Sequence, residues 1–263
     1  MRIVVLMKPV PDPVAASERL RPDGRLDRAN APAVVNPNDE YALEAALKLV
    51  EAHGGEVTLL TMAPAAAPET IRKALAMGAH RGVLVTDTAL EGSCVHSTAT
   101  VLAAALAQLE FDLVLFGVDS TDGGAGTVPA AVAAKRALPY LSAAGKIEPD
   151  PAAGTVRVRR MTPTGYDLLE APMPALIVCT QALGEPRYPS LKGIMSARSK
   201  EIRTFSLADL GLDDGSVGGA AATTRLTGTS TPPARGAARI IKDAPAEAAR
   251  QVVDYLVEKW IIQ

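Results

Sequence analysis

Short apolar runs alternate with segments of helical periodicity through residue 137 of the chain. Each run is too short for a helix and is followed by a polar turn and a helix signal, such as Asn36-Pro37 or Pro68. This alternation predicts an α/β fold with a doubly wound, mainly parallel, Rossmann-like sheet. The predicted strands are Arg2–Met7, Val57–Met62, Val83–Thr86 and Leu113–Phe116, and the predicted helices start at Pro37 and cover 68–77, 95–109 and 128–137.

The pattern changes after Leu138. Polar alternation with turns between the segments predicts a small antiparallel addition at 146–150, 155–161 and 166–170, and an apolar run at 174–180 predicts one more buried strand. We therefore assign residues 1–211 to one α/β domain.

A segment without periodicity, 215–239, is rich in Gly, Ala, Ser, Thr and Pro and predicts an extended arm. The arm leads into an amphipathic helix at 245–262, and we assign 212–263 to this C-terminal part. The apolar face of the helix carries Val252, Val253, Leu256 and Trp260. That face must dock either on its own domain or on a partner chain.

Composition excludes several classes of function. The 263 residues carry a formal charge of −2, so no basic excess indicates nucleic acid, and only 3% are aromatic. Cys94, Cys179 and the three histidines show no metal-ligand spacing. No signal peptide and no membrane-spanning run is visible, so we expect a cytoplasmic protein without membrane insertion.

The stretch Phe111–Lys135 combines a strand, a glycine-rich loop and a helix start. Glycines let the backbone approach an anion, and the free N–H groups of a first helical turn face it. An ordinary strand-to-helix turn explains the pattern equally well. No lysine or arginine lies between Gly117 and Ala134, which weakens an ATP-cleaving alternative. No catalytic constellation and no metal site is predicted.

Four further motifs extend over nearly the whole chain. They are Lys8, Val10 and Asp12 in the opening IVVLMKPVPD; Asn36-Pro37 with Asp39-Glu40; ETIRKALAMGA at 69–79; and EPRYPSLKGIMSARSK at 185–200. In these motifs the chain resembles the beta subunit of electron-transfer flavoproteins. The glycine-rich loop falls where that family binds AMP.

The resemblance implies a heterodimeric electron carrier rather than an enzyme. Such a beta subunit holds a structural AMP and contributes one wall to an FAD held mainly by an alpha subunit. The complex accepts electrons from dehydrogenases, such as acyl-CoA dehydrogenases in fatty acid oxidation, and passes them to a membrane quinone oxidoreductase. The positions matching its AMP contacts are Leu6, Asn36, Pro37, Asn38, Asp39, Met62, Gly117, Val118, Asp119, Ser120, Thr121, Asp122, Gly123, Gly124, Ala125, Gly126, Thr127 and Val128.

The segment 184–202 matches the family's recognition loop. Leu191 corresponds to an apolar anchor that inserts into a partner dehydrogenase, with Tyr188, Ile194 and Met195 beside it. The surrounding Pro, Ser, Lys and Gly are poor core formers, which favours an exposed binding residue over a buried leucine.

Two departures from the family pattern leave alternatives open. Met161 stands where relatives often carry a glutamate near the flavin, and the loop 117–128 has more glycine and fewer acids than in many relatives. Some members bind a second FAD at this loop and bifurcate electrons, which is the first alternative. A free-standing ATP-binding domain is the second.

Overall fold

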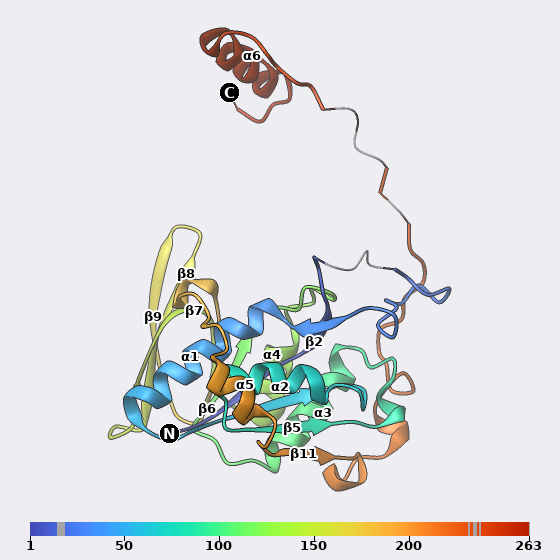
Figure 1. Cartoon of the computed structure of the whole chain (residues 1–263), viewed down its shortest axis with the longest axis vertical. Helices are drawn as coiled ribbons and strands as arrows, with labels where there is room; N and C mark the ends of the chain where they lie inside the picture. The colour runs from blue at the N-terminus through green and yellow to red at the C-terminus, as the bar shows by residue number, and fades with distance from the viewer. Residues whose placement is uncertain (15–18, 231, 234–235, 237, 263) are drawn as a thin grey trace. The chain divides into compact units, whose positions relative to one another are not determined.

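The chain forms two compact units, Met1–Leu226 and Thr227–Gln263, in the computed structural model (Figure 1). The structure describes all residues except 15–18, 231, 234–235, 237 and 263. Residues 212–226 therefore belong to the first unit, although the sequence pattern places them in the arm. The reason is Val217, which is fully buried in the core of the first unit, next to a buried hydrogen bond from Ser97 Oγ to the Gly218 carbonyl.

One twisted sheet organises the first unit. Within the described residues it has nine strands in the order β11-β5-β4-β1-β6-β10-β7-β8-β9, parallel from β11 to β7 and antiparallel from β7 to β9. The predicted mainly parallel sheet with an antiparallel addition is thus confirmed. The strands are β1 (Arg2–Leu6), β4 (Glu56–Met62), β5 (Arg81–Val85), β6 (Leu113–Gly117), β7 (Tyr140–Asp150), β8 (Thr155–Thr162), β9 (Gly165–Pro172), β10 (Ala175–Cys179) and β11 (Ile202–Phe205).

Helices cover both faces of the parallel part, as Figure 1 shows. Side chains of α1, α2 and α5 join one hydrophobic core, and those of α3 and α4 join the other. Because both faces are covered, β6 and β10 are buried along their whole length, which explains their unbroken apolar sequences. The helices are α1 (Pro37–His53), α2 (Pro68–Met77), α3 (Val95–Ala107), α4 (Val128–Arg136) and α5 (Leu191–Ala197).

A small second sheet lies between β1 and α1. Strands β2 (Pro9–Pro11) and β3 (Ala33–Val35) pair antiparallel. The two ends of the proline-rich segment between them therefore lie side by side. The short helix α5 and the edge strand β11 were not expected from the sequence. Strand β11 pairs with β5 through residues 202–205 and has an exposed outer side, which weakens its apolar signal.

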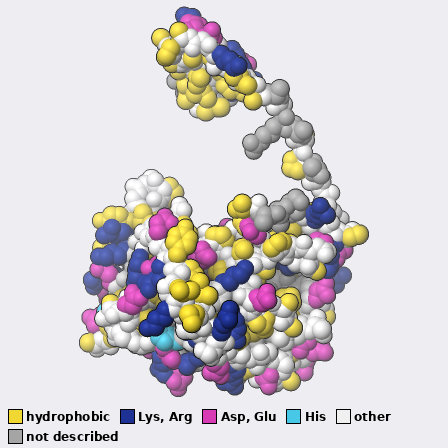
Figure 2. All heavy atoms as spheres, in the orientation of Figure 1, with side chains coloured by type: hydrophobic (Ala, Val, Ile, Leu, Met, Phe, Trp, Pro, Cys, Tyr) yellow, Lys and Arg dark blue, Asp and Glu magenta, His cyan; other side chains and the backbone are white. Residues whose placement is uncertain are grey.

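The second unit contains helix α6 (Pro245–Glu258), which ends four residues before the predicted Ile262. None of its described side chains is buried, and Val252, Val253 and Trp260 are 45%, 49% and 86% exposed. Figure 2 shows apolar side chains gathered on this helix. The predicted amphipathic face therefore exists as an exposed surface.

Candidate functional site

The centre of the sheet supplies the crevice in which such folds bind ligands. From β1 the chain adds β4 and β5 on one side and then β6 and β10 on the other, so the strand order reverses between β1 and β6. Leu6 and Gly117 end these two strands. The predicted residues Leu6, Met62, Val118 and Val128 belong to or pack on one hydrophobic cluster at this point.

The glycine-rich loop leaves its backbone open. Residues 123–127 are all exposed, and Gly124 and Gly126 have φ angles of 55° and 61°, which side-chain-bearing residues rarely adopt. Helix α4 follows directly, with Pro129 in its first turn. The loop and the free N–H groups of this first turn form an anion-binding arrangement.

Two asparagines tie this loop to the start of α1. Asn36 Nδ2 donates to the Asp119 carbonyl at 2.7 Å, and Asn36 Oδ1 accepts from the Thr121 N–H at 3.3 Å. Asn38 Nδ2 donates to Asp119 Oδ1 at 2.6 Å. Asn36 is the N-cap residue as expected, but only its carbonyl serves the helix, because its side chain holds the loop.

Asp39 and Gly117 join the ends of β1 and β6 to α1. Asp39 Oδ2 accepts the N–H of Lys8 at 2.9 Å, and Asp39 is 6% exposed. Burial raises the pKa of Asp39 to about 7, although N–H donors from Lys8 and Gly117 and the Asn36 side chain favour its charged form. A Cβ on Gly117 would lie 2.6 Å from both the Asn38 carbonyl carbon and Asp39 Oδ1.

Two cations reach the loop from elsewhere in the chain, so the lack of lysine and arginine between Gly117 and Ala134 does not leave the loop without nearby cations. Lys8 Nζ lies 2.9 Å from Asp122 Oδ1, and the Arg28 guanidinium pairs with Asp122 Oδ2. Burial opposes ionisation of Asp122, but Lys8 and Arg28 hold its pKa at about 2. Lys8 lies two residues after the end of β1, one of the two strands that border the crevice, and that position is the signal that the sequence offered.

The predicted recognition residues lie on and before α5, outside the crevice. Leu191, Ile194 and Met195 are 75%, 47% and 68% exposed, and Tyr188 is 94% exposed. The Ser190 side chain caps the helix by accepting the Gly193 N–H at 3.0 Å. The contact with α2 needs Gly193, since a Cβ there would lie 2.3 Å from the Ala76 carbonyl oxygen.

Arg187 anchors this segment to α1. Its Nε lies 2.7 Å from Glu44 Oε2, its NH2 group lies 3.1 Å from Glu44 Oε1, and the Glu51 carboxylate accepts from NH1 and NH2. Glu44 is only 4% exposed. The guanidinium of Arg187 donates to two carboxylates at once, which fixes the orientation of this segment as well as its distance from α1. The exposed apolar residues that follow, from Tyr188 to Met195, therefore keep their outward position.

Met161 lies on the outward face of the antiparallel addition. It is 40% exposed, sits opposite Tyr166 on β9, and packs over Gly145, where a Cβ would lie 2.6 Å from its sulfur. The neighbouring Arg160 pairs with Asp167. At this position the face therefore presents an apolar thioether in place of an acid.

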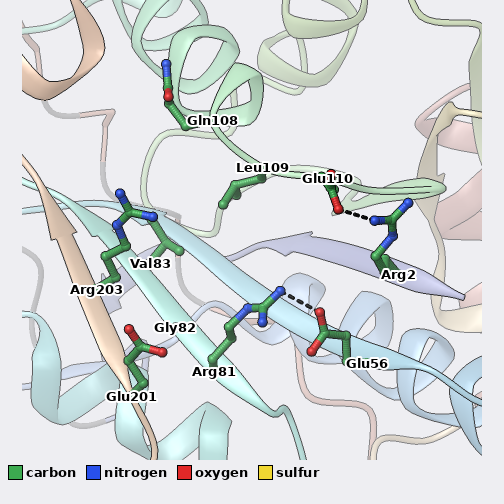
Figure 3. Close-up of a pocket in the computed structure, with 10 residues that line it drawn as sticks. All are labelled: Arg2, Glu56, Arg81, Gly82, Val83, Gln108, Leu109, Glu110, Glu201 and Arg203. Atoms are coloured by element: carbon green, nitrogen blue, oxygen red, sulfur yellow. Dashed lines mark hydrogen bonds and ion pairs between the residues drawn. The ribbon is translucent and has the colours of Figure 1, made fainter.

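A hollow of about 300 Å³ lies at the opposite, amino-terminal ends of the strands (Figure 3). Arg2 pairs there with Glu110, and Arg81 with Glu56. Because ligands of doubly wound sheets bind beyond the carboxyl ends, and these cations already have partners, we do not place the site here.

Among the residues that the structure describes, no group of three or more His, Cys, Asp or Glu side chains is placed to hold a metal ion. No described helix combines the length and the hydropathy needed to cross a membrane.

Comparison with known proteins gives the family. The electron transfer flavoprotein domain matches residues 23–210. Electron transfer flavoprotein subunit beta of Mycobacterium tuberculosis is 41% identical over 268 residues, covering 99% of each chain. The corresponding subunit of Clostridium acetobutylicum and the caffeyl-CoA reductase-Etf complex subunit CarD of Acetobacterium woodii are each 34% identical, with full coverage of both chains. The chain therefore belongs to the electron transfer flavoprotein family, among its beta subunits.

Proposed function

We propose that this chain is the beta subunit of a heterodimeric electron carrier and holds AMP in the crevice between β1 and β6. The observation that carries the proposal is the open glycine-rich loop, held by Asn36 and Asn38 beside an apolar cluster. An adenine ring needs an apolar slot, and a phosphate needs free N–H groups. The residues proposed to contact the nucleotide lie at the ends of β1, β4 and β6, at the start of α1, or on the loop itself.

The partner is an alpha subunit that carries most of an FAD site. The exposed apolar face of α6 supports such a partner, because an isolated helix of this length with no buried side chain is marginal in water. FAD supplies the redox chemistry, and this chain contributes position and environment. Electrons arrive from dehydrogenases, such as acyl-CoA dehydrogenases, and leave to a membrane quinone oxidoreductase.

A second candidate function is a two-FAD carrier that bifurcates electrons. Its support is the exposure of residues 123–127, which leaves room beyond a single phosphate. The similarity to a subunit named for a caffeyl-CoA reductase-Etf complex agrees with it.

Cofactor content separates the two candidates. We expect the chain, co-purified with its alpha subunit and extracted with acid, to release FAD and AMP in equal amounts. Two FAD and no AMP per heterodimer would replace the first candidate by the second. A stable monomer that binds ATP and no flavin would contradict both.

Leu191→Ala is expected to slow electron transfer from a partner dehydrogenase at least several-fold, because an exposed apolar anchor contributes mainly to complex formation. Stopped-flow flavin reduction measures the rate, and FAD content should stay unchanged. Leu20→Ala is the matched control, since Leu20 is 56% exposed and lies outside the recognition segment. Equal rates for Leu191→Ala and the unmodified complex would remove the anchor role.

A further inference from the structure

Asp122 differs from the other acid of the glycine-rich loop in its burial and its partners. Its side chain is 1% exposed, whereas Asp119 is exposed and bonds to asparagines. One oxygen of the Asp122 carboxylate forms an ion pair with Lys8, and the other forms an ion pair with Arg28. Two cations and one carboxylate leave this group with a single net positive charge.

Lys8 lies where a phosphate on the loop would meet it. Lys8 Nζ is 3.7 Å from the position of a Cβ on Gly123, the first residue of the exposed part of the loop. It also lies 3.3 Å from Ser120 Oγ. A phosphate seated on the exposed backbone therefore shares Lys8 with the Asp122 carboxylate and lies close to that negative charge.

The carboxylate remains charged at neutral pH. Lys8 and Arg28 hold the pKa of Asp122 at about 2 against the effect of burial, so protonation does not relieve its repulsion of a ligand. A buried charge is screened far less by salt than an exposed one. Its effect on a nearby phosphate is therefore direct.

We propose that Asp122 sets the charge selectivity of the nucleotide site, because its buried carboxylate repels each added phosphate charge and so lowers the affinity for ADP and ATP more than the affinity for AMP. AMP and the pyrophosphate of FAD both carry two negative charges near neutral pH. ADP and ATP carry further negative charges, and Asp122 repels these as well. The proposal rests on the nucleotide-binding function proposed above.

Calorimetric titration with AMP, ADP and ATP, without divalent metal, tests the selectivity. The full-length chain is used in complex with its alpha subunit after removal of bound nucleotide. The affinities of the unmodified complex for the three nucleotides set the reference ranking. Asp122→Asn is expected to raise the affinities for ADP and ATP relative to AMP by roughly tenfold for each added charge.

Two further variants keep the test decisive. Arg28→Gln leaves Asp122 fully neutralising Lys8, so AMP affinity is expected to fall on the order of tenfold even if Asp122→Asn does not fold. Glu110→Gln removes the same formal charge at an 83% exposed position at the opposite end of the strands and should leave the ranking unchanged.

The outcomes distinguish the selectivity from the site itself. An equal change for all three nucleotides in Asp122→Asn, or an unchanged AMP affinity in Arg28→Gln, would show that the three charges only fasten the loop, and the selectivity would be wrong. If the unmodified complex binds none of the three nucleotides and takes up FAD alone or no ligand, the proposed AMP site fails before any variant is compared.

Discussion

Gly117→Ala is expected to destabilise the first unit by roughly 1–3 kcal/mol or more and to abolish nucleotide retention. The added methyl would lie 2.6 Å from the carbonyl carbon of Asn38 and from Asp39 Oδ1, both at the start of α1. Backbone cannot rotate away as a flexible side chain does. The first turn of α1 must therefore shift, and with it Asn36 and Asn38, which hold the glycine-rich loop.

Denaturant unfolding and acid extraction of AMP measure the two effects of Gly117→Ala. Gly215→Ala is the matched control, because a Cβ there meets nothing within 4 Å and its φ is not positive. It should change the free energy of unfolding by less than about 0.5 kcal/mol. If Gly117→Ala keeps full AMP content and stability, the close approach of β6 to α1 does not position the loop.

The strands of the parallel core were predictable because a strand that is buried on both faces has an unbroken apolar sequence. Val114 and Ile177 are fully buried on neighbouring strands, and their segments were found from sequence at nearly their observed bounds. The helix starts at Pro37, Pro68 and Val128 follow in the same way from proline in or near the first turn. Local chemistry was sufficient for these elements.

The charges of the site were not predictable, because they depend on contacts between distant residues. Lys8 reaches Asp122 from the link between β1 and β2, and Arg28 reaches it from the segment between β2 and β3. A search of the loop's own sequence for cations misses both. The same reason explains Val217, whose glycine-rich surroundings resemble an arm although the side chain is fully buried against the first unit.

The motif of the recognition segment predicted its exposed apolar residues but not its secondary structure. Its apolar residues were found, but α5 was not, because Pro189 and Gly193 oppose a helix locally. Tertiary contacts override that preference. Lys200 Nζ donates to the carbonyls of Leu75 and Ala79 at the end of α2, at 3.0 and 2.6 Å, and so fastens the segment from its other side.

Arg187→Ala is expected to cost roughly 3 kcal/mol of stability, the lower end of the range for breaking a buried ion pair, because a third of the arginine side chain stays exposed. Glu44 is left buried without its main partner. Burial opposes ionisation of Glu44 in the intact protein, yet Arg187 keeps the pKa of Glu44 below its usual value. The pair therefore stabilises the fold above the ordinary glutamate pKa and loses this effect as the pH falls through the lowered one.

The stability difference between Arg187→Ala and the unmodified protein should accordingly be larger at pH 8 than at pH 4, as measured by denaturant unfolding at each pH. Glu51→Gln is the control, because Glu51 is 56% exposed and its loss should cost less than about 1 kcal/mol. Hydrogen exchange should show faster exchange across α5 in Arg187→Ala alone, and transfer from a dehydrogenase should slow although Leu191 is intact. Unchanged exchange and transfer would mean that Ser190, Gly193 and Lys200 suffice to hold the recognition surface, and that the arginine stabilises only α1.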